Sequence, residues 1–295
     1  MLGAIGSFLV TGAMISAIYA LIAIGFTMIF GVGGVLNLAH GGLIMLGAYG
    51  FLVVTSSSTV EFLAIPPIAG LAVAIAVGAV ASYGLYVGLV EYIEDNPVIT
   101  FLATLVVALI LAELAIVAFS SSPRGLVNLA PGSSGQSVGL RVTNLEIVAF
   151  VTSWVAIGLL WYYVTRTDDG RSILATSMSQ RGAQLTGVDL PSVKAKTWLI
   201  AGALAGLAGV FIGTLQQTSP TMWLDPLALA FIIVVIGGIG SIKGSIVAAY
   251  LIGYLETLTV TLLGSGFRGT FSLVVLVIVL LVMPQGLFGR EWVHE

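Results

Sequence analysis

Long apolar runs separated by short polar stretches dominate the chain. A helix that spans a bilayer needs roughly 20 mostly apolar residues. We therefore predict an all-α, polytopic integral membrane protein with about eight to nine membrane segments, some of them broken by glycine, in a single transmembrane domain over residues 1–295. The candidate segments are 5–30, 32–54, 62–90, 98–119, 145–164, 197–215, 227–239, 245–263 and 270–283.

Glycines interrupt two of these segments, 32–54 and 227–239, and neither segment needs to cross fully. Gly-Gly-Val at 33–35, followed by two glycines at 41–42, resembles Gly-Gly-Ile at 237–239, followed by Gly244. Paired broken segments in two halves of a chain point to a transport site. Close helix packing is the alternative explanation, because glycine lets helix backbones approach one another.

The polar stretches give a partial topology. The stretch 120–144 is rich in Ser, Gly and Pro and is predicted to be an extramembrane loop, whereas 166–196 holds half of the ten Lys and Arg residues. The positive-inside rule places 166–196 in the cytoplasm, and counting spans forward places the C-terminus, with Arg290, there too. No basic residue precedes the first apolar run, which favours a retained helix over a cleavable signal peptide and leaves the side of the N-terminus open.

Composition supports a membrane protein and excludes several functions. Of the 295 residues, 58% are hydrophobic and 8% are charged, too few charges to cover the surface of a soluble fold. The net charge of −3 gives no support for nucleic-acid binding. There is no cysteine, and the two histidines, His40 and His294, are far apart, so we expect neither a metal nor another cofactor.

No catalytic signature is present, and we predict no catalytic residues. The sequence lacks a phosphate-binding loop, a His-Glu-x-x-His motif and a Gly-x-Ser-x-Gly motif. The run 237–245 is a near miss, because Gly follows Lys243 and the run lies within an apolar segment. Any ATP-driven work must therefore come from another subunit.

Two acidic residues lie within predicted spans. A carboxylate at the bilayer centre costs about 2.5–3.5 kcal/mol, so Glu113 and Glu256 should face protein or water. Each could line a pathway, or be a protonated or hydrogen-bonded packing residue. A proton-coupled transporter would be a rival use of the same two side chains.

The stretch Asn-Leu-Ala-His-Gly-Gly at 37–42 lies between two apolar runs. A broken helix exposes backbone groups, which membranes tolerate only beside protein or a water-filled cavity. The alternative is a turn at the membrane surface in which Asn37 caps the next helix. The candidate pathway residues are Asn37, His40, Gly41, Glu113, Gly237, Gly238, Gly240 and Glu256. Separately, Gly202 and Gly206 form a face on which helices can pack closely.

Several motifs in register resemble a known family. They are YALIAIG at 19–25, IFG at 29–31, NLAHG at 37–41, GAY at 47–49, TDDGR at 167–171, AQLTGV at 183–188, LAGLAG at 204–209, VIGGIGS at 235–241 and PQGLFG at 284–289. Together they resemble the branched-chain amino acid permeases of ABC importers, most closely the LivH type, whose relatives also serve urea and short amides. The chain departs from the family in the acidic stretch 91–96 and at Met283.

The resemblance implies a heteromeric importer in a prokaryotic cell membrane. Its expected partners are a second homologous permease subunit, two ATP-binding subunits, an extracytoplasmic substrate-binding protein and the lipid bilayer. Branched-chain amino acids, related small amino acids and amides are the implied substrates. A stand-alone channel or proton-coupled carrier for small polar solutes such as urea is the alternative, and a membrane-embedded enzyme lacks a catalytic constellation.

The cytoplasmic stretch is predicted to couple the chain to the ATPases. Residues 179–187 are long enough for about two helical turns, and Pro191 follows. On such a helix Ala183 and Gly187 would share a face and leave a shallow groove for a partner's side chains. The candidate coupling residues are Arg171, Arg181, Ala183, Gln184, Gly187 and Asp189. An ordinary solvated loop is the alternative.

Overall fold

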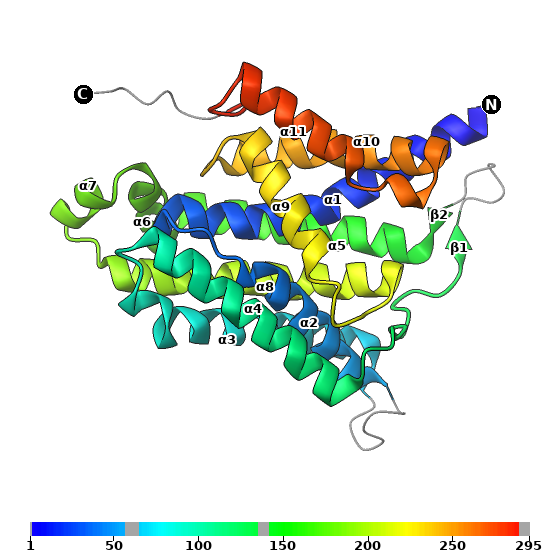
Figure 1. Cartoon of the computed structure of the whole chain (residues 1–295), viewed down its shortest axis with the longest axis horizontal. Helices are drawn as coiled ribbons and strands as arrows, with labels where there is room; N and C mark the ends of the chain where they lie inside the picture. The colour runs from blue at the N-terminus through cyan, green and yellow to red at the C-terminus, as the bar shows by residue number, and fades with distance from the viewer. Residues whose placement is uncertain (1, 57–64, 135–141, 289–295) are drawn as a thin grey trace.

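The protein is a bundle of helices, seen here in a computed structural model that describes residues 2–56, 65–134 and 142–288 (Figure 1). The start of the predicted segment 62–90, Arg290 and His294 lie outside the described residues. The helices are α1 Leu2–Gly33, α2 Ala39–Thr55, α3 Pro67–Gly88, α4 Pro97–Phe119, α5 Asn144–Arg166, α6 Asp168–Met178, α7 Gln180–Leu185, α8 Leu190–Gln216, α9 Leu224–Gly237, α10 Ile242–Leu263 and α11 Thr270–Val282. Short 3-10 turns cover Val90–Tyr92 and Ser265–Phe267, and β1 (Ser133–Ser134) pairs antiparallel with β2 (Val142–Thr143).

Each of the nine predicted membrane segments contains one long or apolar helix, which confirms the all-α, polytopic prediction. Among the described residues, seven helices are long and apolar enough to cross a membrane, and α2 and α9 are shorter apolar helices. These two short helices are the segments in which glycines were expected to interrupt a span. The length of the apolar runs therefore predicted the segments correctly, and the interrupting glycines indicated the two segments whose helices are shorter.

The centre of the bundle is formed by α1 and α8. In their most apolar stretches 83% and 72% of residues are buried, against 11–39% in the other long helices. Small residues allow α8 to pack this tightly: a Cβ atom on Gly202 would overlap the carbonyl oxygen of Gly78 on α3, and one on Gly206 would overlap that of Ala74. The predicted close-packing face of Gly202 and Gly206 is therefore confirmed.

The two ends of the bundle differ in charge. Helices α6 and α7 lie at one end and the β1–β2 hairpin lies at the other (Figure 1). Six of the ten basic residues belong to the α6–α7 end, namely Arg166, Arg171, Arg181, Lys194, Lys196 and Lys243. Arg124 and Arg268 belong to the opposite end.

Candidate translocation and coupling site

The connection between α1 and α2 enters the interior of the bundle. Residues 34–38 are not helical, and the Leu38 N–H donates to Thr104 Oγ1 of α4 at 3.1 Å. At the start of α2, His40 Nε2 lies 3.2 Å from the carbonyl oxygen of Ile22. Ile22 lies eleven residues before the end of α1, about 16 Å along its axis. Helix α2 therefore begins deep within the bundle rather than at its end.

The burial of this stretch shows whether it lies inside the bundle or forms a turn at the surface. Asn37 and His40 are 1% and 0% exposed, so the stretch is not a turn at the surface of the chain. Asn37 is not the cap of α2 either, because Leu38 is the N-cap residue; Asn37 Oδ1 instead accepts from the Ala39 N–H at 3.0 Å. Asn37 Nδ2 and His40 Nδ1 are buried with no hydrogen-bond partner among the described residues. Each such group costs about 1–3 kcal/mol, which makes these two atoms candidates for contact with water or a passing solute.

Gly41 fixes the start of α2 against the start of α9. A Cβ atom at position 41 would overlap the carbonyl oxygen of Trp223, the residue before α9. Only glycine permits this approach of two backbones. One candidate pathway glycine thus has a packing function that the geometry explains.

The second break lies between α9 and α10. Gly238 and Gly240 have φ angles of +96° and +82°, which L-amino acids with side chains rarely adopt. The Leu287 and Phe288 N–H groups donate to the carbonyls of Ile236 and Gly237, at 2.8 and 3.1 Å. The end of α9 is thereby completed by a segment that follows α11.

The two breaks touch. A Cβ atom on Gly31, near the end of α1, would lie 3.2 Å from the Cα of Gly240. The structure thus brings Gly237, Gly238 and Gly240 to the end of α1, while Asn37 and His40 lie deeper, where α2 begins. The candidate pathway residues on the two broken connections therefore occupy two different depths.

Glu256 is held in an internal network. It is 3% exposed, and its carboxylate accepts from the Gly269 N–H at 2.9 and 3.1 Å and from the hydroxyl of Ser272. Gly269 is the N-cap residue of α11, so Glu256 of α10 places a negative charge at a helix N-terminus, where it is favourable. This geometry fits the hydrogen-bonded packing alternative. A role for Glu256 in a pathway stays a prediction.

Glu113 has the opposite environment. It is exposed on α4, six residues before the end of that helix, and no hydrogen bond or ion pair of its side chain is found among the described residues. Helix α4 packs on α2, whereas α10 packs on α1, α9 and α11, so the structure does not bring Glu113 and Glu256 together.

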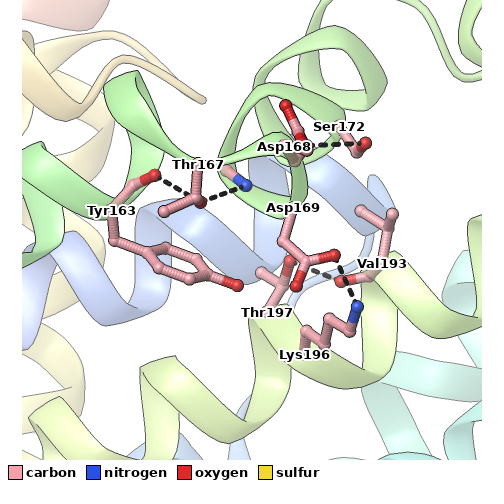
Figure 2. Close-up of polar contacts among 9 residues, drawn as sticks. Tyr163, Thr167, Asp168, Asp169, Ser172, Val193, Lys196 and Thr197 are labelled. Atoms are coloured by element: carbon pink, nitrogen blue, oxygen red, sulfur yellow. Dashed lines mark hydrogen bonds and ion pairs between the residues drawn. The ribbon is translucent and has the colours of Figure 1, made fainter.

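The predicted cytoplasmic stretch is more ordered than a loop. Figure 2 shows Thr167, at the N-cap of α6, donating its hydroxyl to the Tyr163 carbonyl and accepting from the Gly170 N–H, at 2.8 and 3.0 Å. Asp169 of α6 pairs with Lys196 of α8 at 2.6 Å. The sequence interpretation missed α6, although Thr followed by two Asp at 167–169 is a helix start signal.

The expected shared face of Ala183 and Gly187 is wrong. Helix α7 ends at Leu185, and Gly187 follows it with a φ angle of +88°. The Val188 N–H donates to the Ala183 carbonyl and the Gly187 N–H to the Gln184 carbonyl, which is the Schellman arrangement that ends a helix at glycine. Ala183 is 4% exposed and faces the protein, so no groove forms there.

Other side chains are presented outward at this end. Leu174 and Met178 of α6 and Leu185 of α7 are 47%, 60% and 83% exposed, and we call these three residues the α6–α7 apolar group. The candidate coupling residues that are exposed around it are Arg171, Arg181, Gln184, Gly187 and Asp189. The α6–α7 apolar group was not predicted, because α6 was missed and the six residues of α7 are too few to show which face is buried.

Two further contacts at this end were also missed. Gln180 Nε2 of α7 donates to the carbonyl of Val32 at the end of α1, at 2.9 Å. Lys194 pairs with Glu94 at 2.8 Å, and their side chains are only 9% and 16% exposed. The acidic stretch 91–96 was the available sequence signal for the second contact, since a largely buried acidic side chain needs a basic partner elsewhere in the chain.

A polytopic bundle of long apolar helices defines an integral membrane protein as its class. The family model for the permease component of branched-chain amino acid transport systems matches residues 8–283, and the chain belongs to this family. No solved structure matches it.

Named relatives cover nearly the whole chain. The high-affinity branched-chain amino acid transport system permease protein BraD of Pseudomonas aeruginosa is 28% identical, over 97% of this chain and 96% of its own length. The probable branched-chain amino acid transport permease protein LivH of Methanocaldococcus jannaschii is 28% identical, over 95% and 92%. The ribose import permease protein RbsC of Escherichia coli is 26% identical, over 82% and 74%.

Proposed function

We propose that this chain is the transmembrane permease subunit of an ATP-binding-cassette importer that carries branched-chain amino acids, or related small amino acids or amides, into a prokaryotic cell. Its partners are a second homologous permease, two ATP-binding subunits and an extracytoplasmic binding protein. The observation that carries the proposal is the match of residues 8–283 to the permease component of branched-chain amino acid transport systems. The hydrogen bond from Gln180 to the Val32 carbonyl supports it, because it joins the helices of the predicted ATPase contact to the end of α1, from which the broken connection starts.

The orientation rests on charge. The positive-inside rule assigns the end that holds six basic residues to the cytoplasm. Leu287 and Phe288 are bonded to the end of α9 at this same end of the bundle. The segment after α11 is therefore assigned to the cytoplasmic side, together with α6 and α7.

We assign the contact with the ATP-binding subunits to the α6–α7 apolar group. Leu174, Met178 and Leu185 are exposed at the end of the bundle that is assigned to the cytoplasm. Apolar side chains that are exposed to water on adjacent helices, as on α6 and α7, are typical of contacts with other proteins. Arg171 and Arg181 supply charge at the rim of such a contact, where they favour specificity and the rate of association.

The solute pathway is assigned to the broken connection. Asn37 Nδ2 and His40 Nδ1 are polar atoms deep in the bundle without a partner among the described residues. Irregular backbone at membrane depth is tolerated where it lines a cavity or is covered by protein. ATP binding and hydrolysis in the partners would shift the equilibrium between outward- and inward-open states, and Gln180 would transmit the shift to residues 34–40.

The experiment uses the complex assembled from this chain and its co-encoded partners. Met178→Asp and Leu185→Asp place a charge on exposed positions, so folding is retained, while the apolar contact is lost. The control is Val127→Asp, also on an exposed apolar residue, 40% exposed, at the opposite end. We expect both docking variants to lose ATPase co-purification and ATP-dependent leucine uptake in proteoliposomes, and the control to keep them.

Two results would contradict the proposal. Uptake of leucine or urea by this chain alone, without partners or ATP, would favour the channel or carrier. Full ATPase binding by both docking variants would mean that the ATP-binding subunits contact another surface.

A further inference from the structure

A cavity opens at the end of the bundle opposite α6 and α7. Its volume is about 160 Å³, and α1, α5, α8 and the turn before α11 enclose it. A protein cavity of about 150 Å³ holds a molecule as large as benzene. This cavity is therefore large enough for a small solute, and too small for most drug-sized ligands.

The buried part of the lining is aliphatic except for Tyr19, which is 4% exposed. Ile18 of α1 and Ile212 of α8 are 2% and 4% exposed, and Ile15 and Leu215 extend this surface outward. Leu215 is 40% exposed and lies at the mouth. The floor of the cavity thus matches a branched, saturated side chain in chemistry.

The polar part of the lining carries one charge of each sign. It consists of Tyr19, Glu146, Gln216 and Arg268. Arg268 and Gln216 are exposed, so the charged head of a bound solute would remain near the mouth. Opposite charges above an aliphatic floor are the complement of a zwitterion with an aliphatic tail.

Both charged groups have capacity left for a ligand. Glu146 uses Oε2 to accept from the backbone N–H and the hydroxyl of Thr143, at 2.8 and 2.9 Å, and no bond to its Oε1 is found among the described residues. The guanidinium of Arg268 has no hydrogen-bond or ion-pair partner among the described residues either. An arginine fork binds a carboxylate through two parallel hydrogen bonds, and it is the usual protein group for this purpose.

We propose that this cavity is a binding site for one aliphatic α-amino acid, with its carboxylate on Arg268, its ammonium group on Glu146 and its side chain against Ile18 and Ile212. The inference rests on the proposed function and narrows its substrate class. Urea and short amides have neither the two charges nor the branched side chain that this lining complements. On the assigned orientation the cavity opens to the outside, where a binding protein would release its cargo.

Thiol protection tests the site directly, because the chain contains no cysteine. Leu215→Cys places a single thiol at the mouth, and Val127→Cys is a matched control that is equally exposed, at 40%, and does not line the cavity. The full chain in lipid nanodiscs is treated with a water-soluble methanethiosulfonate. We expect L-leucine at ten times its dissociation constant to slow modification of Leu215→Cys about tenfold by simple mass action, and to leave Val127→Cys unaffected.

Analogues and charge variants test the chemistry. We expect 4-methylpentanoate, 3-methylbutylamine and urea to protect far less than leucine. In the Leu215→Cys background, Arg268→Gln should raise the leucine concentration for half-protection about tenfold or more, as loss of a charged hydrogen bond predicts, and Arg268→Lys should raise it less. Glu146→Gln should act like Arg268→Gln while α5 stays folded, because Gln also completes the cap that Glu146 forms with Thr143.

The outcomes separate this inference from the proposed function. If the complex imports leucine but leucine does not protect Leu215→Cys, the amino acid site is overturned and the importer stands. If leucine protects the thiol but the complex shows no ATP-dependent uptake, the site stands and the importer is overturned. Equal protection by urea, or by the acid and the amine alone, would overturn recognition of a zwitterion.

Discussion

Glycines differ in how much space a side chain would find, and α3 contains one tightly packed glycine and one beside open space. A Cβ atom on Gly78 would overlap the Gly202 carbonyl oxygen of α8, whereas Gly84 has no atom within 4 Å of that position. We expect Gly78→Ala to destabilise the protein by about 1–3 kcal/mol through overpacking. Gly84→Ala should be neutral or stabilising by up to about 1 kcal/mol, because alanine is the better helix former.

The measurement is the thermal stability of the two variants in detergent, followed by size-exclusion chromatography. Since the two variants add the same methyl group to the same helix, their difference reports the local contact alone. Equal melting temperatures would mean that α3 and α8 are not packed as closely as described.

At the scale of elements, α11 depends on a carboxylate from α10. Glu256 accepts from Gly269 and Ser272 at the start of α11, and both oxygens are engaged. We expect Glu256→Gln to keep most of its uptake with an unchanged pH profile, since an amide oxygen can still accept at this cap. Glu256→Ala should lose about 1–2 kcal/mol of stability, as other lost caps do.

Uptake by the assembled complex between pH 5.5 and 8, together with thermal melting, distinguishes a cap from a proton carrier. A proton-coupled carrier that uses Glu256 would lose transport in the Gln variant while keeping its stability. That outcome would revive the rival use of this residue.

The helices also show how much of the fold could be predicted from the sequence. The nine membrane segments were predictable because each is an apolar run, and the length of the run determines whether it can span. The depth at which α2 begins was not predictable, because it is set by contacts with Thr104 and Ile22, which lie far from position 38 in sequence. The burial of Ala183 and the pairing of Lys194 with Glu94 likewise depend on neighbours that no local pattern reveals.

At the scale of the whole molecule, one outer face requires a partner. Glu113 is exposed on α4 among apolar side chains that are themselves 49–84% exposed, namely Leu109, Ile110, Leu114 and Val117. A carboxylate facing lipid costs up to about 2.5–3.5 kcal/mol at membrane depth. We therefore expect the second permease subunit to cover this face and supply a polar partner.

If this expectation is correct, one substitution changes two measured quantities in opposite directions. Glu113→Leu should raise the amount of isolated chain inserted in membranes and lower its co-purification with the second permease. Val117→Leu, at an equally outward position 84% exposed, should alter neither quantity. Normal assembly of the Glu113→Leu chain would place the permease contact on another face.

The bonds from Leu287 and Phe288 to the end of α9 have a consequence for biosynthesis. The carbonyls of Ile236 and Gly237 are left without helical partners, and their donors lie some fifty residues later in the chain. A ribosome that adds about 5–20 residues per second reaches those donors seconds after α9 has emerged. Throughout that interval the two carbonyls lack the donors that bond them in the folded chain, and a nascent chain stopped after Met283 never acquires those donors.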